Sequence, residues 1–260
     1  MADTLGPTQL PLGVGTDGRV LAWDWYRDPN ALVGGPAGWG KTFACRGILD
    51  GMERAAQQGR EGGMVVWNPK AVGYYAFRDR LARPEWCSDF RLSNVAELWQ
   101  ESFSPFLWGI HEHRMAVIQG MAASGVDEFR GAGFAPFTVV VEEMQATFQV
   151  LAGLPTPKGC RKPADAVSSD LDAMTALFRA SGIRFVLVSQ AMTSEGGIST
   201  KTKNNCTAKL FLGPVDDGGF LACFGQSKPP QFARKYRPVL GSGIFQCPDL
   251  GTRVVQVKFE

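Results

Sequence analysis

A phosphate-loop pattern near the N-terminus constrains this chain more than any other stretch. The pattern G-x-x-x-x-G-K-T runs from Gly35 to Thr42, directly after the apolar residues 31–33 and before a helix-like stretch. Glycines allow backbone conformations that side chains would block, so successive N–H groups can turn inward on an anion. The pattern predicts a nucleotide site made of Gly35, Pro36, Ala37, Gly38, Trp39, Gly40, Lys41, Thr42 and Phe43.

Two side chains of this loop carry the expected chemistry. Lys41 supplies a positive charge for the outer phosphates, which makes it a candidate catalytic residue. The hydroxyl of Thr42 is placed to bind Mg²⁺ at the point where the following helix begins. We therefore expect the cofactors ATP and Mg²⁺.

A second acidic motif is expected at the end of residues 137–141, the most strand-like run in the chain. Glu142 and Glu143 follow that run directly. In a phosphate-loop enzyme, a neighbouring strand delivers one acidic residue to Mg²⁺, and an adjacent one can orient or deprotonate water. We expect Glu142 to bind the metal with Thr42 and Glu143 to act on water. The alternative is a solvated acidic strand end.

A further polar side chain follows the apolar run 183–188. Gln190 stands at the end of that predicted strand, where an amide can sense the γ-phosphate, and it is a further catalytic candidate beside Lys41, Glu142 and Glu143. His111 and His113 lie two residues apart in a helical pattern and so face different directions, which makes them poor ligands for a shared metal.

Composition sets the broad class of the protein. The 260 residues are 45% hydrophobic and 20% charged, which suits one large core, so we expect a flexible arm over 1–12 and a single domain over 13–260. Six cysteines without a C-x-x-C pair indicate reduced thiols in the cytoplasm rather than disulfides or zinc ligands. No apolar run reaches the roughly 18 residues of a spanning helix, and the net charge of +2 neither demands nor excludes nucleic acid.

Strand-like and helix-like patterns alternate along the chain, which predicts an α/β fold with a mostly parallel central sheet flanked by helices, plus terminal β-hairpins. The predicted hairpins cover 13–25 and 243–259, and the predicted strands cover 31–33, 64–67, 90–92, 137–141, 183–188 and 208–212. Helices are expected over 41–58, from Asn94 to 99, and over 106–122, 165–181 and 218–225, with a helix and a loop over 71–86. Exposed loops are expected over 153–169 and 193–205.

The ordered set of motifs resembles the FtsK/SpoIIIE family of DNA-pumping ATPases, within the wider FtsK–HerA group of hexameric motors. The pieces are GTDGRVLAWDW, DPNALVGGPAGWGKT, VVWNPK, EHR, FTVVVEEM, FRASGIRFVLVSQ, STKTKNN, GSGIFQC and RVVQVKF, which span nearly the whole chain from about Pro11. The resemblance implies a RecA-like core, ATP at the subunit boundaries of a hexameric ring, and double-stranded DNA in the central channel.

The resemblance also assigns residues. Gly35 to Thr42 matches the Walker A motif, Val139 to Glu143 matches Walker B, and Gln190 matches the glutamine that closes the next strand. Arg179 falls where related motors carry an arginine that could reach a neighbour's nucleotide in trans. Its alternative role is a solvated arginine at a helix C-terminus.

Two departures from the family pattern bear on these assignments. Glu142 and Glu143 stand where the family usually has Asp-Glu, and Asn68 replaces the acid of its D-P-K motif. We expect no membrane segment before the motor and no winged-helix module after it. The chain is therefore expected to be the motor alone, in a phage, plasmid or conjugation context, or alternatively a viral genome-packaging ATPase.

Two basic segments are candidates for contacting DNA phosphates. They carry Lys158, Arg161 and Lys162 in the first and Lys201 and Lys203 in the second, although basic residues in polar loops are usually only solvated. Three functions remain open: a translocase of double-stranded DNA, a secretion-type ATPase of the same fold that acts on protein cargo, and a nucleotide-binding subunit without turnover. The third would be expected to lack Lys41 or the acidic pair, and both are present.

Overall fold

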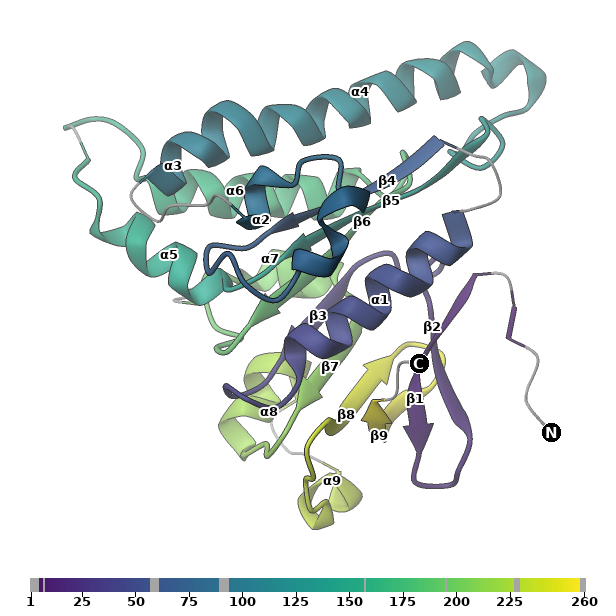
Figure 1. The fold of residues 1–260 in the computed structure, drawn as a ribbon, viewed down its shortest axis with the longest axis vertical. Helices are drawn as coiled ribbons and strands as arrows, with labels where there is room; N and C mark the ends of the chain where they lie inside the picture. The colour runs from purple at the N-terminus through teal and green to yellow at the C-terminus, as the bar shows by residue number, and fades with distance from the viewer. Residues whose placement is uncertain are drawn as a thin grey trace.

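A single mixed sheet organises the computed structural model, which describes residues 5–6, 8–56, 61–88, 94–156, 158–194, 196–226 and 230–257. The nine strands of the described chain run in the order β2-β1-β9-β8-β7-β3-β6-β5-β4 (Figure 1). The strands β7, β3, β6, β5 and β4 are parallel to one another, and all other neighbouring pairs are antiparallel. The parallel strands are β3 (Ala31–Gly34), β4 (Glu61–Trp67), β5 (Phe134–Val141), β6 (Ile183–Ser189) and β7 (Ala208–Leu212).

Two hairpins, one from each end of the chain, extend this parallel sheet on one side. They consist of β1 (Gln9–Gly15) with β2 (Val20–Asp24), and of β8 (Ser242–Cys247) with β9 (Gly251–Val257). β8 pairs with β7, and β1 pairs with β9, so strands from the beginning and the end of the chain lie side by side. Both terminal hairpins are as predicted, but the sheet is mixed rather than mostly parallel because they join it instead of standing apart.

The central strands are buried on both sides because alternate side chains enter two separate cores. Val33, Val66 and Val140 belong to one core, which also contains the apolar side of α1 (Lys41–Ala56) and the N-terminal hairpin. Their neighbours Leu32, Val65 and Val141 belong to the other core. Helices cover that second face, including α4 (Ser104–Gly120), α5 (Met144–Gly153), α6 (Pro163–Leu177) and α8 (Asp217–Phe224) (Figure 1).

Short helical segments complete the fold. They are η1 (Tyr75–Arg80), α2 (Glu85–Ser88), α3 (Val95–Leu98), η3 (Trp99–Phe103), η4 (Ala122–Ser124), α7 (Thr200–Asn205) and α9 (Gln231–Lys235). No helix in the described ranges is both long and apolar enough to span a membrane.

Several predicted boundaries need correction. The N-terminal arm was predicted to reach residue 12, but Gln9 already begins β1, and Leu10 packs so closely on α1 that a Cβ at Gly51 would lie 1.7 Å from it. The loop predicted over 153–169 is interrupted because α6 begins at Pro163. Residues 200–205 of the second predicted loop form α7, whose N-cap Ser199 accepts from the amide of Thr202. The strand predicted over 90–92 lies outside the described residues.

Candidate nucleotide site

The phosphate loop connects the carboxyl end of β3 to the first turn of α1. Gly35, Gly38 and Gly40 all have positive φ angles, of 135°, 81° and 93°, which side chains rarely adopt. A Cβ at Gly35 would lie 2.1 Å from the carbonyl oxygen of Leu212, whereas one at Gly38 would meet no atom within 4 Å. The loop therefore needs glycine for close packing on one side and faces open space on the other, which is the shape that an oligophosphate requires.

Lys41 is held inside the loop by main-chain carbonyls. Its Nζ donates to the carbonyl oxygens of Gly35 at 2.7 Å and Pro36 at 2.8 Å, and the residue is 8% exposed. Burial lowers the pKa of Lys41, and the nearby carboxylates Glu143 and Glu142 act in the opposite direction. When a nucleotide binds, its phosphate oxygens can replace these carbonyl oxygens as acceptors for the Lys41 ammonium group.

The two candidates for binding a metal ion, Thr42 and Glu142, lie within hydrogen-bonding distance of each other. Thr42 Oγ1 donates to Glu142 Oε1 over 3.2 Å, although the two residues are a hundred positions apart in the sequence. Glu142 directly follows β5, and its amide donates to the carbonyl of Trp67 at 2.8 Å, which fixes it beside β4. At phosphate-loop sites Mg²⁺ binds oxygens of the protein and oxygens of the phosphates. A threonine hydroxyl and a carboxylate are the protein ligands used there.

Tyr74 is a partner of Glu142 that the sequence patterns did not identify. Its hydroxyl donates to Glu142 Oε1 at 2.5 Å, and both residues are buried, at 1% and 3% exposure. Burial raises the pKa of Glu142; the hydrogen bond from Tyr74 lowers it, and the negative charge of Glu143 raises it again. Tyr74 therefore stabilises the ionised form of the carboxylate, which is the form that binds a metal ion.

Glu143 has an unusual backbone conformation. Its φ of 53° and ψ of 42° place it in the left-handed region, as the residue that precedes α5. Such a conformation costs about 1–3 kcal/mol in a residue other than glycine, and it is found often at functional sites. The carboxylate forms an ion pair with Lys70, whose side chain is half exposed. The two acidic residues thus differ in environment, with Glu142 buried against Thr42 and Tyr74 and Glu143 paired with a lysine.

Gln190 lies at the same edge of the sheet. It follows β6, whose last residue Ser189 is in register with Gly34 of β3, so Gln190 and Gly35 leave adjacent strands side by side. Gln190 is exposed. Asn68, the departure from the D-P-K motif, follows β4 at this edge; its side chain donates to the carbonyl of Val72 at 2.6 Å and accepts from the amide of Lys70 at 3.2 Å. Asn68 thereby shapes the turn that presents Lys70 to Glu143.

Arg179 is not part of this cluster. It lies between α6 and β6, at the amino end of the strand, whereas the phosphate loop and Gln190 lie at the carboxyl ends. The seven residues of β6 separate the two edges by about 20 Å. Arg179 is exposed, so a catalytic role requires a nucleotide on another subunit.

The predicted DNA contacts occupy two different settings. Lys158, Arg161 and Lys162 are exposed between α5 and α6, and Arg161 donates to the hydroxyl of Ser169. Lys201 is also exposed, but on helix α7 rather than in a loop. Lys203 is partly buried, and its Nζ donates to the carbonyl oxygens of Met192 and Ala222, both at 3.3 Å. A lysine anchored in this way is poorly placed to contact DNA.

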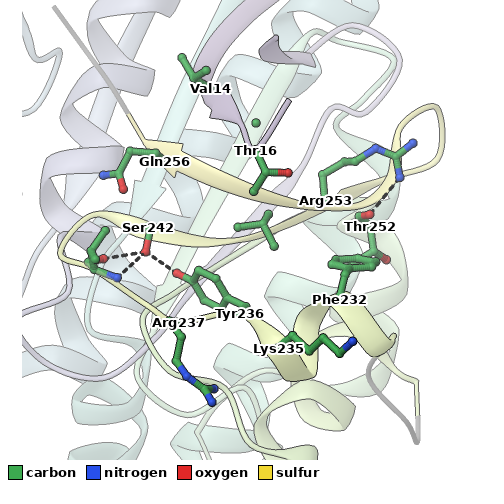
Figure 2. Close-up of a pocket in the computed structure, with 13 residues that line it drawn as sticks. Val14, Thr16, Phe232, Lys235, Tyr236, Arg237, Ser242, Thr252, Arg253 and Gln256 are labelled. Carbon is green, nitrogen blue, oxygen red and sulfur yellow. Dashed lines mark hydrogen bonds between the residues drawn. The ribbon is translucent and has the colours of Figure 1, made fainter. Parts of the chain in front are cut away.

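A cavity of about 610 Å³ lies between α9 and the antiparallel strands (Figure 2). Gly241, which precedes the lining residue Ser242, lies near the phosphate loop, because a Cβ at Gly40 would lie 3.8 Å from Cα of Gly241. Ser242 lines the cavity, and its hydroxyl forms a hydrogen bond with the hydroxyl of Tyr236, as Figure 2 shows. The described lining includes Lys235, Arg237 and Arg253 but no acidic residue and none of the predicted site residues.

The chain resembles known proteins in its structure, but searches with its sequence find no match. No protein-family model matches the chain, and no curated protein matches its sequence. The conjugation coupling protein TcpA of pCW3, solved as a monomer with ATPγS, superposes with a TM-score of 0.70 at 19% identity; the match covers 99% of this chain and 68% of TcpA.

Two secretion proteins are similar to almost the same extent. EssC (ATPases 2 and 3) from Geobacillus thermodenitrificans has a TM-score of 0.69 at 16% identity, over 100% of this chain and 46% of that one. The cytoplasmic domain of the type VII secretion ATPase EccC from Thermomonospora curvata has a TM-score of 0.66 at 14% identity, over 97% and 29%. This chain thus spans less than half the length of either secretion protein. The chain therefore shares the fold of these three ATPases, and this agrees, for the fold, with the resemblance seen in its sequence.

Proposed function

We propose that the chain is an ATP-hydrolysing motor that assembles as a ring, most simply a hexamer, and translocates double-stranded DNA. The observation that carries ATP hydrolysis is the meeting of Lys41, Thr42, Glu142 and Glu143 at one edge of the sheet. The DNA substrate is supported by the family resemblance of the sequence and by the structural similarity to a conjugation coupling protein.

Each side chain has a distinct part in the proposed reaction. Backbone N–H groups of the loop and Lys41 hold the phosphates, while Thr42 and Glu142 provide oxygens for Mg²⁺. The metal ion, when bound, neutralises charge that develops on the phosphate oxygens. Glu143 orients the attacking water and accepts its proton, which requires its carboxylate to exchange Lys70 for water. Gln190 contacts the γ-phosphate from the adjacent strand.

A second candidate function is transport of protein rather than DNA. EssC and EccC have the same fold, and EccC has been solved with a signal sequence peptide. The DNA-contact residues do not discriminate strongly, since Lys203 is anchored to main-chain carbonyls. The two candidates share the nucleotide chemistry and differ in what stimulates it.

The decisive experiment is ATP hydrolysis measured with and without linear duplex DNA. We expect turnover that depends on Mg²⁺ and rises when duplex is added, with a Lys41→Ala protein as the inactive control. Stimulation should be similar for unrelated DNA sequences, because a motor that moves along any sequence contacts phosphates rather than base edges. Turnover that duplex leaves unchanged would favour the protein-cargo function, and absence of turnover would favour a nucleotide-binding subunit.

A further inference from the structure

Arginines gather at the amino end of β6, far from the phosphate loop. Arg184, the second residue of β6, lies close enough to Arg179, Arg130 and Arg114 for their charges to act on it. A pocket of about 310 Å³ opens beside it. Its described lining consists of Tyr26, Glu128, Phe129, Ala176, Leu177, Arg179, Ala180 and Arg184.

Arg184 is buried without a full set of partners. It is 1% exposed; Nη1 donates to the carbonyl of Arg179 at 3.2 Å, and the guanidinium lies 5.1 Å from the ring centre of Phe129. Its Nε is buried with no hydrogen-bond partner among the described residues. Burial and the neighbouring arginines lower the pKa of Arg184 to about 9. A guanidinium has five donors, and burying one is costly unless an anion pairs with it.

The charges around the pocket are not balanced. Within the described ranges, no carboxylate forms an ion pair with Arg130, Arg179 or Arg184. Glu128 is the acid in the described lining, and its carboxylate accepts the hydroxyl of Tyr26 instead. Arg130 lies beside the pocket, with its guanidinium carbon 4.3 Å from the ring centre of Tyr26. The described lining thus combines two arginines, Arg179 and Arg184, with one acid that is already hydrogen-bonded.

We propose that this pocket binds an oxyanion of the phosphate type, with Arg184 as its buried donor and Arg179 at its rim. Guanidinium groups match the geometry of phosphate oxygens, and the pocket is large enough for a tetrahedral phosphate group. A phosphate bound to the phosphate loop of the same chain cannot be the ligand of this pocket, because the two sites lie at opposite ends of β6, about 20 Å apart. Two sources remain: free phosphate, or the terminal phosphate of a nucleotide held by a second copy. The second source rests on the proposed ring.

The first test is titration of orthophosphate into a Lys41→Ala protein at constant ionic strength, followed by calorimetry. Glu128→Gln keeps an acceptor for Tyr26 and removes the acidic charge, so we expect it to tighten phosphate binding about tenfold, or 1.4 kcal/mol. Arg184→Met should weaken binding at least about tenfold. Arg19→Met is the matched control, because Arg19 has a 78% exposed side chain in the β1–β2 turn, and it should leave binding unchanged.

These outcomes decide the proposal without reference to ATP hydrolysis. The proposal is wrong if orthophosphate does not bind. It is also wrong if neither Glu128→Gln nor Arg184→Met changes the affinity for orthophosphate. If Arg184→Met does not fold, the Glu128→Gln comparison decides alone, because that change keeps the size of the side chain and its hydrogen bond to Tyr26.

A second measurement separates the two sources. Sedimentation of the unmutated chain with Mg²⁺ and ATPγS should reveal nucleotide-dependent association, which Arg184→Met weakens if the phosphate of a second copy enters the pocket. Equal association of both proteins, combined with loss of orthophosphate binding in the variant, identifies free phosphate as the ligand. A chain that hydrolyses no ATP but passes the orthophosphate test would refute the motor function and leave the oxyanion pocket standing.

Discussion

Replacing Tyr74 by phenylalanine removes a single hydroxyl from the buried carboxylate of Glu142, and the effect of this change should depend on pH. The hydroxyl donates to Glu142 Oε1 at 2.5 Å inside the core. A hydrogen bond to a charged group contributes about 1.5–3 kcal/mol, so we expect Tyr74→Phe to lower the free energy of unfolding by that amount where Glu142 is ionised.

The sign of the pH dependence follows from the raised pKa of Glu142. Burial disfavours the ionised carboxylate in the folded chain, so this cost is absent below the unfolded pKa of about 4.3 and fully present above the folded pKa. Tyr74 reduces the cost, and Tyr74→Phe therefore raises the pKa of Glu142 further. The destabilisation should be largest near about pH 8 and shrink as the pH falls towards about 4.

Urea unfolding of both proteins across this pH range, without nucleotide or Mg²⁺, measures the difference. A Glu142→Gln background is the control, because it removes the titrating group and should make the effect of Tyr74→Phe independent of pH. Mg²⁺-dependent ATP turnover should also need more metal in Tyr74→Phe, most strongly at low pH. A destabilisation that is the same at every pH, in both backgrounds, would refute the role of Tyr74 in keeping Glu142 ionised.

The remaining predictions concern turnover and DNA. Lys41→Ala should abolish nucleotide binding or turnover, whereas Glu143→Gln should retain bound ATP without hydrolysis, as filter binding and phosphate release would measure; normal turnover in Glu143→Gln would mean that the other glutamate acts on water. Arg179→Ala should lose roughly a thousandfold in turnover with ATP affinity nearly unchanged, and mixing it with Lys41→Ala subunits should restore part of the activity; full activity at high dilution would refute a role in trans. Neutralising the three cations of 158–162 should reduce the salt dependence of DNA binding by up to about 2.7 in slope, and Lys203→Ala should change it little; an unchanged slope in the triple variant would remove that segment from the DNA path.

Local patterns predicted most of the elements because the central strands are long apolar runs that enter two cores. The runs ending before Glu142 and Gln190 became β5 and β6, and the loop between β3 and α1 formed where its glycines predicted. The candidate site residues at the strand ends lie at one edge of the sheet for the same reason, since the carboxyl ends of parallel strands meet there. An apolar run followed by a polar residue therefore predicts where a strand lies and where it ends.

Features that depend on partners distant in the sequence could not be predicted. Tyr74 follows a turn without any motif, and only the folded chain brings its hydroxyl to Glu142. The polar residues of α7 suggested a loop, but Ser199 caps the helix and Asp172 of α6 accepts from Thr202, which stabilises it from outside. The mixed character of the sheet depends on β8 pairing with β7, and alternating patterns do not reveal which strand will be the neighbour.

The position of β3 in the sheet has a consequence for how the protein is made. β3 is a strand of four residues with β6 on one side and β7 on the other, and Leu212 at the end of β7 forms the wall against which Gly35 packs. The ribosome therefore releases the phosphate loop about 180 residues before the last strand that holds it, a delay of roughly 10–35 s at 5–20 residues per second. We expect nascent chains that end before β7 to bind no nucleotide, so that ATP can stabilise the protein only once synthesis has nearly finished.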